Sequence, residues 1–226
     1  MTAVPVRDRI VERAARANIA IPTANLEKLT AYFQLLSIWN RTINLTGLAL
    51  EPVSDEAIDR LLVEPLAAVS VLGGSPLIPE LTHLTWTDLG SGAGSPAIPM
   101  KIGLPDSVLT MVESKSRKVA FLREAVRTLA LREAAVVNAR FNEIEGSASA
   151  DLVTVRAVRL DQEFATVAAR LLRDGGVLAA FQPSVEPSRL SLLDISAAVP
   201  LVPDRQSWLH FYRRVPRGTI DSMAPK

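Results

Sequence analysis

The sequence predicts an α/β protein whose Rossmann-like, mostly parallel sheet follows a helical region. Three observations lead to this fold class. Short apolar runs alternate with helical segments after residue 75, a glycine-rich turn follows the first of these runs, and residues 1–75 contain only helical patterns. Strand–helix alternation of this kind indicates parallel strands with helices on both faces of the sheet.

The N-terminal helical region, residues 1–75, is expected to contain three helices. Apolar residues recur at helical spacing over 7–20, and a second apolar stripe follows Thr23, a suitable N-cap residue. A third helix is expected from about Ser54 to Val71, with a kink at Pro65, because proline lacks the backbone donor that a helix interior needs. Trp39 lies on the second stripe and is expected in the core.

Residues 76–226 are expected to form the ligand-binding core, beginning after the Gly/Pro-rich stretch "GGSPLIPE". Helices are predicted within 115–131 and 162–175. Strands are predicted near 84–89, 107–112, 134–138, 151–155 and 176–181, with a last one over 207–215 that is antiparallel, either at an edge or between neighbours.

Composition excludes several function classes. The 226 residues include no cysteine, which rules out disulfides, thiolate metal ligands and a cysteine nucleophile. The two histidines, His83 and His210, are far apart in sequence, so no metal site is expected. No apolar run reaches the roughly 18–20 residues that a membrane span needs, and the charged N-terminus lacks a signal-peptide pattern. The expected location is the cytoplasm.

Basic residues are clustered although the net charge is only +1. The two groups are Lys115, Arg117, Lys118, Arg123 and Arg127, and near the end Arg213, Arg214 and Arg217. Each group can be a solvated face or the rim of a nucleic-acid cleft. If Lys115 and Lys118 contact a phosphate backbone, RNA affinity should fall steeply with added salt.

The stretch "WTDLGSGAGSPAIPMKIG", residues 86–103, places a glycine-rich turn between a strand and a helix. Its pattern is Gly90-x-Gly92-x-Gly94, with Ser95 where a dinucleotide fingerprint needs glycine, and it lacks the Lys–Ser/Thr pair of a phosphate-binding loop. S-adenosylmethionine carries no phosphate and fits such a turn better. An ordinary strand–helix turn is the alternative.

Each part of this stretch has an expected role toward that cofactor. Asp88 would supply negative charge for the sulfonium, and the glycines would let the backbone approach the methionine part. Ser95 is expected to cap a helix that begins at Pro96. Glu113, at the end of the next strand, would bind both ribose hydroxyls.

Four stretches then resemble the RsmG (GidB) family, which methylates N7 of a guanine in small-subunit (16S) ribosomal RNA. They are "WNRTINLTGL", "DRLLVEPL", the cofactor turn followed by "LTMVESKSRKVAFLREAVRTLAL", and "VRAV". The resemblance covers residues 26–182. It implies a class I methyltransferase fold with a seven-stranded sheet, the cofactor S-adenosylmethionine, and as partner small-subunit ribosomal RNA or the assembling small subunit.

The resemblance also implies residue roles. Gly90 and Ser95 would lie beside the cofactor, with Asp88, Gly92 and Gly94 completing the turn and Glu113 on the ribose. "NARFNEI" resembles the family's G-R-A-E-E-L, so Phe141 and Asn142 would flank the adenine. A final set of residues is assigned to RNA, namely Asn44, Arg60, Lys115 and Lys118.

Arg156 is the expected catalytic residue and would line the reaction centre. Its guanidinium would stack on the base or donate to a guanine edge, which places N7 in line with the methyl group. A salt bridge to Asp88 or Glu113 is the alternative. Asn44 likewise has an alternative role, as the cap of the turn in "INLTGL".

The expected chemistry agrees with these residues. Guanine N7 has an in-plane lone pair and loses no proton on methylation, so alignment matters more than a general base. A cysteine adduct for pyrimidine C5 is impossible here, and "TVRAV" stands where exocyclic-amine methylases carry an N/D-P-P-aromatic tetrad.

Several positions depart from the family pattern. Leu61, Pro65, Ser95, Ala97 and Val155 replace a histidine, a serine, an aromatic residue, a glycine and a serine. "AFQPS", which includes Gln182, replaces a K-G. Two alternatives to the guanine-N7 activity therefore stay open: a related methyltransferase with another RNA or small-molecule acceptor, and a binding module that keeps the cofactor fold without turnover.

Overall fold

The computed structural model describes residues 4–78, 80–146, 148–203 and 205–215, so Arg217 of the second basic group lies outside the described residues. The elements in chain order are α1 (Val6–Arg16), α2 (Thr23–Ile43), α3 (Asp55–Ile58), the π-helical turn η1 (Asp59–Val63), α4 (Glu64–Gly73), β1 (Thr85–Leu89), α5 (Ala97–Gly103), β2 (Val108–Glu113), α6 (Ser116–Thr128), β3 (Ala134–Asn138), the 3-10 turn η2 (Phe141–Glu143), β4 (Ala150–Arg156), α7 (Gln162–Leu171), β5 (Leu172–Gln182), β6 (Leu193–Pro200) and β7 (Trp208–Arg214).

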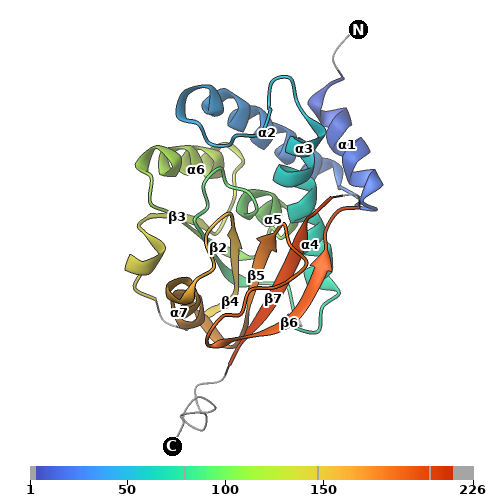
Figure 1. The fold of residues 1–226 in the computed structure, drawn as a ribbon. Coiled ribbons are helices and arrows are strands. Elements are labelled where there is room, and N and C mark those ends of the chain that lie inside the picture. The colour runs from blue at the N-terminus through green and yellow to red at the C-terminus, as the bar shows by residue number, and fades with distance from the viewer. Residues whose placement is uncertain (1–3, 79, 147, 204, 216–226) are drawn as a thin grey trace, which may run out of the picture.

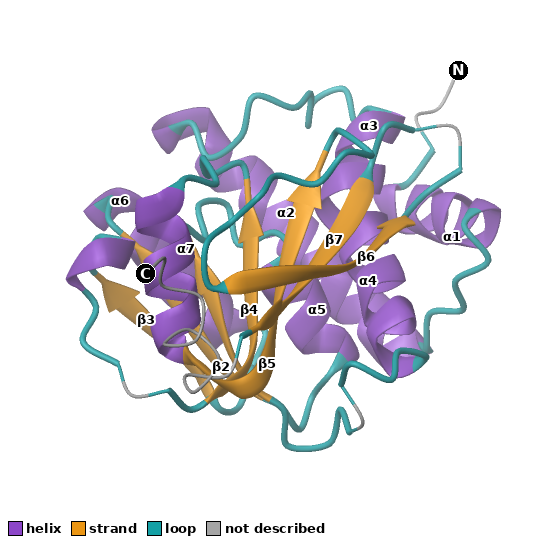
Figure 2. Ribbon diagram, turned by 60° about the horizontal axis from the view of Figure 1, so that its bottom comes forward, coloured by secondary structure: helices purple, strands orange, loops and turns teal. Residues whose placement is uncertain are grey.

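The strands form one seven-stranded sheet in the order β3-β2-β1-β4-β5-β7-β6 (Figure 2). The first five are parallel, and β7 is antiparallel to both β5 and β6. The predicted fold class is confirmed, and the last predicted strand lies between two neighbours. The edge strand β6 was not predicted, because the three consecutive small residues Ser196, Ala197 and Ala198 and the exposed residues before them give it a weak apolar signal.

The two faces of the sheet are covered very unequally (Figure 1). Helices α1 to α6 pack on one face around a core that includes Trp86, Phe121 and Phe181. The other face is covered by α7 and by the segment that leads into β6, around Phe164 and Tyr212. The core on the first face is continuous from α1 to the sheet, so the helical region and the strands share their buried surface.

Three predicted boundaries were wrong. The first helix ends at Arg16 instead of residue 20, and Thr23 is the first residue of α2 without capping it, because Pro22 holds the cap position and no side chain bonds there. The predicted helix over 162–175 ends at Leu171, where the fully buried Leu172 already begins β5 beside Ala150. Burial of the leucine in the sheet outweighs the helical pattern.

The strand order reverses between β1 and β4, which lie side by side although β2 and β3 separate them in sequence. Ligand crevices of open parallel sheets lie at the carboxyl ends of the strands at such a reversal. The glycine turn of residues 90–95 follows β1 directly, and Arg156 ends β4. The fold therefore brings the two predicted centres of the site to one place.

Candidate active site

The glycine turn adopts a backbone that side chains would not tolerate. Gly90 has φ +73°, and a Cβ there would lie 2.8 Å from Cγ2 of Val158 in the segment after β4. Gly94 has φ +85°, and a Cβ would lie 2.5 Å from Cδ1 of Ile98 in α5. Positive φ and close approach both require glycine. Gly90 thus lets the turn approach the end of β4, whereas Gly94 lets it pack on α5.

Glu113 is held across this turn by backbone amides. Its Oε2 accepts a hydrogen bond from the Gly92 N–H at 2.9 Å, and its Oε1 accepts one from the Lys115 N–H at 2.8 Å. The residue is 7% exposed. Hydrogen bonds from backbone N–H groups stabilise an ionised carboxylate and fix its orientation. The carboxylate is therefore preorganised at the end of β2, where a ribose was expected.

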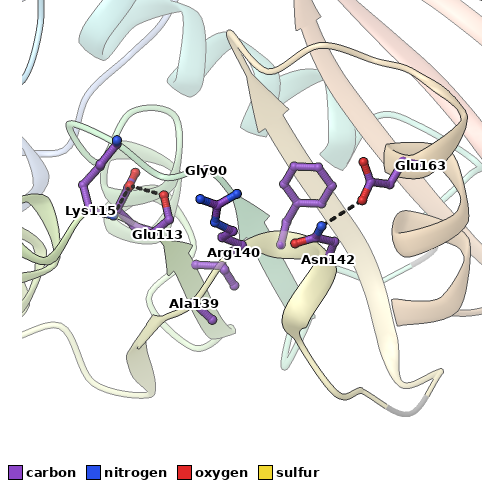
Figure 3. A pocket seen from close by; sticks show the side chains of 10 residues that line it. Gly90, Glu113, Lys115, Ala139, Arg140, Asn142 and Glu163 are labelled. Carbon is purple, nitrogen blue, oxygen red and sulfur yellow. Dashed lines mark hydrogen bonds between the residues drawn. The ribbon is translucent and has the colours of Figure 1, made fainter.

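A cavity of about 400 Å³ opens beside Glu113 (Figure 3). Gly90 and Glu113 border it on one side, and Phe141, Asn142 and Glu163 on the other. Asn142 Nδ2 donates to Glu163 Oε1 at 2.8 Å, and the Phe141 ring packs edge-on against Phe164 at a centroid distance of 5.7 Å. A carboxylate, an aromatic face and an amide around one cavity fit an adenosine group, as the roles assigned to Glu113, Phe141 and Asn142 require.

Asp88 lies beneath the turn and borders neither of the cavities described here. The residue is 1% exposed, its Oδ1 accepts a hydrogen bond from Thr154 Oγ1 at 2.6 Å, and its Oδ2 has no partner among the described residues. Burial raises the pKa of Asp88 to about 6. The carboxylate was expected beside the sulfonium, but the alternation of β1 turns it toward β4 and the helical face instead.

A second cavity, of about 350 Å³, shares Gly90 and Glu113 with the first. Its other walls come from the loop after α2, from η1, from the glycine turn, from α6 and from the end of β4. Besides Glu113, the polar and charged side chains on it are Thr46, Arg60, Ser91, Ser95, Lys118 and Arg156. The structure therefore brings Arg60, Ser95, Lys118 and Arg156 together from four segments that are distant in sequence.

Arg156 is fixed from three sides. Its Nη2 lies 2.9 Å from Glu64 Oε2, its Nη1 donates to the carbonyl oxygen of Arg60, and its guanidinium carbon lies 4.4 Å from the centre of the Phe181 ring. Its side chain is 13% exposed and that of Glu64 is 4% exposed. Burial lowers the pKa of Arg156, and the Glu64 carboxylate opposes this shift, so the guanidinium stays charged.

The alternative partners of Arg156, Asp88 and Glu113, form no ion pair with it. Glu113 is occupied by the Gly92 and Lys115 amides, and Asp88 by Thr154. The acid that pairs with Arg156 belongs to α4, which lies 92 residues earlier in the chain.

Pro65 explains two of the contacts in this cavity. Because proline has no N–H, it cannot donate to the carbonyl groups four and five residues earlier, those of Leu61 and Arg60. Ser95 Oγ donates to the Leu61 carbonyl at 3.0 Å, and Arg156 Nη1 donates to the Arg60 carbonyl. The predicted kink takes the form of the π-helical turn η1 directly before α4.

The prediction that Ser95 caps a helix was wrong, because its hydroxyl group donates to η1 instead. Helix α5 begins at Ala97, Pro96 holds its N-cap position, and no side chain caps it. The Ser95 hydroxyl is directed instead toward η1 and the carbonyl of Leu61.

Two contacts that support the candidate site were missed by the sequence patterns. Tyr32, fully buried in α2, donates its hydroxyl hydrogen to the Ala93 carbonyl at 2.7 Å and so ties the helical region to the glycine turn. Asn40 Oδ1 accepts hydrogen bonds from the N–H groups of Leu45 (2.7 Å) and Thr46 (2.9 Å). The "WN" of the N-terminal signature was a signal that could have pointed to Asn40. Tyr32 gives no such signal, because its position in α2 fits the pattern of any core residue.

The remaining predicted residues lie around the same edge of the sheet. Lys115 borders the first cavity and Lys118 the second. Asn44 is exposed and ends α2 in the left-handed conformation, φ 44°, so the side chain that caps the following turn is that of Asn40. Trp39 packs against Phe121 with ring centroids 5.8 Å apart, as expected of a core residue.

Comparison with known proteins decides the family. A family model described as rRNA small subunit methyltransferase G (GidB) matches residues 25–199. The chain belongs to this family. A ribosomal RNA small subunit methyltransferase G of Neisseria meningitidis is 34% identical over 188 residues, which are 81% of this chain and 84% of that protein. One from Stenotrophomonas maltophilia is 34% identical over 168 residues, 74% of this chain and 73% of that protein.

The fold of this methyltransferase G family member is shared with a solved structure. A SAM-dependent methyltransferase from Aquifex aeolicus superposes with a TM-score of 0.54 and 14% identity, over 73% of this chain and 96% of that one. Family and fold confirm the prediction of a methyltransferase that uses S-adenosylmethionine.

Two further observations concern the described residues of this family member. None of its described helices combines the length and apolar character needed to cross a bilayer. Its described His, Asp and Glu side chains form no group of three that would hold a metal ion.

Proposed function

We propose that this protein transfers the methyl group of S-adenosylmethionine to N7 of a guanine in small-subunit ribosomal RNA, with Arg156 placing the base. The observation that carries the proposal is the position of Arg156. Its guanidinium borders the second cavity, which meets the first at Gly90 and Glu113. An acceptor bound there would adjoin a cofactor bound along the glycine turn. The names of the Neisseria and Stenotrophomonas relatives support ribosomal RNA as the acceptor.

The lining of the second cavity suits a nucleophile that needs no base. Among the described residues that border it, Glu113 is the one carboxylate, and histidine is absent. Both oxygens of Glu113 already accept hydrogen bonds from backbone amides. Guanine N7 attacks with its own lone pair and releases no proton, so alignment and electrostatics supply the catalysis.

The bound cofactor supplies an electrophilic methyl group on a sulfonium. Contacts with Glu64, the Arg60 carbonyl and the Phe181 ring hold the Arg156 side chain in place. A guanidinium in this state has further N–H groups that can donate to guanine O6, or a flat face that can stack on the base. Either contact orients the base while N7 stays free.

Basic side chains surround the entrance. Arg60 and Lys118 border the second cavity, and Lys115 the first, so phosphates that flank the target base would meet positive charge. This arrangement supports the roles assigned to these residues and to the nearby Asn44. The substrate is ribosomal RNA or the assembling small subunit, and such a substrate agrees with a cytoplasmic location.

The test is methyl transfer from labelled S-adenosylmethionine to three acceptors: deproteinised small-subunit RNA, intact small subunits, and a metabolite pool. Digested RNA is then analysed for 7-methylguanosine. We expect label in 7-methylguanosine with wild type, and none with Arg156→Ala, although calorimetry still shows S-adenosylmethionine binding and no NAD binding. Turnover by Arg156→Ala at the wild-type rate would contradict the role of Arg156.

The other outcomes separate the alternatives. Label in the metabolite pool, or in another nucleotide, would identify a different acceptor. Cofactor binding without label in any acceptor would favour the binding module.

A further inference from the structure

A third cavity, of about 480 Å³, lies outside the site described so far. Its lining residues are Arg13 and Arg16 of α1 and Val202, Pro203 and Arg205 of the loop between β6 and β7. Three guanidinium groups and no carboxylate face it among the residues described. All three arginines stand outside the segment 25–199 that the family model matches, so this cavity is built from other parts of the chain.

A buried acid organises two of these arginines. Asp59 of η1 is fully buried, and its carboxylate accepts hydrogen bonds from Arg13 Nε at 2.8 Å and Arg13 Nη2 at 2.6 Å. The same carboxylate accepts a hydrogen bond from Arg205 Nε. One carboxylate thus holds two guanidinium groups from distant segments, and their side chains remain 12% and 28% exposed. Two fixed arginines on one acid leave positive charge at the cavity.

Further ion pairs surround the two arginines that Asp59 holds. Arg16 pairs with Glu12 on its own helix at 2.8 Å, and Arg9 and Arg13 both pair with Asp55. Among the residues that the structure describes, four arginines (Arg9, Arg13, Arg16 and Arg205) therefore face three acids (Glu12, Asp55 and Asp59). The acids Glu12 and Asp55 do not border the cavity, so the charged side chains that border it among the described residues are all arginines.

A fixed guanidinium fork matches the oxygens of a phosphate group and loses little entropy on binding. Arg16, which is 62% exposed, can add a third contact from the solvent side. Several guanidinium groups in one place are the usual means of recognising phosphate in nucleic acids.

The cavity lies at the same edge of the sheet as Arg156. Arg205 stands three residues before Trp208, which pairs with Gln182 at the carboxyl end of β5, and Phe181 pairs with Arg156. The turn η1 reaches both places, because Asp59 holds the arginines of the third cavity and the next residue, Arg60, borders the second. A helical segment is about 10 Å wide, so one RNA strand can reach both sites.

We infer that the third cavity binds a backbone phosphate of the RNA whose target base reaches Arg156. This inference rests on the proposed function, since it takes RNA as the substrate. The cavity then fixes the strand at a second point, away from the reacting base.

The test measures RNA affinity against salt for Arg16→Gln, Arg205→Gln and the double variant. Arg13 is retained, because its loss would remove two of the hydrogen bonds that Asp59 accepts. A labelled fragment of small-subunit RNA is titrated by fluorescence anisotropy. We expect weaker binding and a slope of log affinity on log salt that is less steep by about 0.7–0.9 for each arginine removed. The affinity for S-adenosylmethionine is expected to stay unchanged.

The control is Arg173→Gln. Arg173 is 49% exposed and pairs with Asp151 at the start of β4, the end of the strand opposite to Arg156. For this variant, the slope of log RNA affinity on log salt should equal that of wild type. Thermal unfolding checks the fold of the Arg205 variant, and Arg16→Gln, which leaves Asp59 untouched, gives a separate test.

The outcomes also separate this inference from the proposed function. If wild type binds and methylates RNA and the Arg16 and Arg205 variants keep its affinity and slope, the third cavity is no phosphate site and the proposed function stands. If wild type binds no RNA, both are overturned.

Discussion

The hydroxyl group of Ser95 donates to the carbonyl oxygen of Leu61 at 3.0 Å, and Pro65 explains why that carbonyl needs a side-chain donor. The contact joins the glycine turn to the helical region at the wall of the second cavity. Two of the positions that depart from the family pattern, 65 and 95, are therefore parts of one arrangement.

Ser95→Ala is expected to lower the free energy of unfolding by about 1–2 kcal/mol, because the partly buried Leu61 carbonyl loses its donor. The loss should be smaller in a Pro65→Ala background, where the alanine N–H can donate instead. Denaturant unfolding of the four proteins of this cycle measures the coupling. Ser116→Ala, which removes an exposed bond to Asn138, is the control. An equal loss in both backgrounds would contradict the role given to Pro65.

Glu64→Gln is expected to destabilise the protein by about 3 kcal/mol, because it leaves the buried Arg156 charge without its acid. It should also lower kcat for methyl transfer while the Kd of S-adenosylmethionine stays the same, since the guanidinium is less well positioned. Unfolding curves, turnover and calorimetry measure the three quantities. Glu56→Gln, which affects an exposed pair with Arg60 at 3.7 Å, should change stability by less than about 0.5 kcal/mol.

Asp88 should make the stability depend on pH in the direction opposite to that of a salt-bridged acid. Burial raises its pKa to about 6 in the folded state, above the ordinary value near 4. The folded protein therefore binds the proton more tightly, and stability is lost as pH rises from about 4 to 6. Between pH 4 and 7 wild type should lose about 2 kcal/mol relative to Asp88→Asn. If the stabilities of the two proteins change with pH in parallel, Asp88 has the same pKa in the folded and unfolded states, and the prediction is contradicted.

Gly90→Ala is expected to cost at least about 1–2 kcal/mol of stability, because the new Cβ meets Val158 at a positive φ. It should also weaken S-adenosylmethionine binding, since Gly90 borders both cavities. Adding Val158→Ala removes the steric contact and should restore part of the stability. Gly47→Ala, where a Cβ would have no neighbour within 4 Å, is the control for a glycine substitution in a loop. Equal effects at the two glycines would refute the constraint at Gly90.

The fold could be predicted because its signals are local. Short apolar runs and helical segments of period 3.6 alternate from Thr85 to Gln182, and this alternation indicates the parallel part of the sheet. Strand β6 could not be predicted, because it lies at the edge and buries little. The end of α7 was misplaced because the sequence gives no sign that Leu172 already pairs with the sheet.

The site was predictable where it depends on one short segment. Gly90 and Glu113 follow from the turn and from the end of a strand, and the structure places both on each of the two cavities. The pairing of Glu64 with Arg156 depends on the packing of α4 against the sheet, and no local pattern specifies it. Asp88 was expected at the cofactor because its position in the motif is visible, whereas the direction of its side chain follows from the strand register.

Tyr32 connects the helical region to the glycine turn where the cofactor is expected to bind. Its hydroxyl holds the carbonyl of Ala93, so α2 and the glycine turn can be ordered or loosened together. Free-energy coupling between two sites is reciprocal: if RNA that orders α2 raises the affinity for the cofactor, the cofactor raises the affinity for RNA by the same factor. If RNA orders α2, the protein holds S-adenosylmethionine more tightly while the RNA is bound, and it releases the demethylated product more readily once the RNA has left.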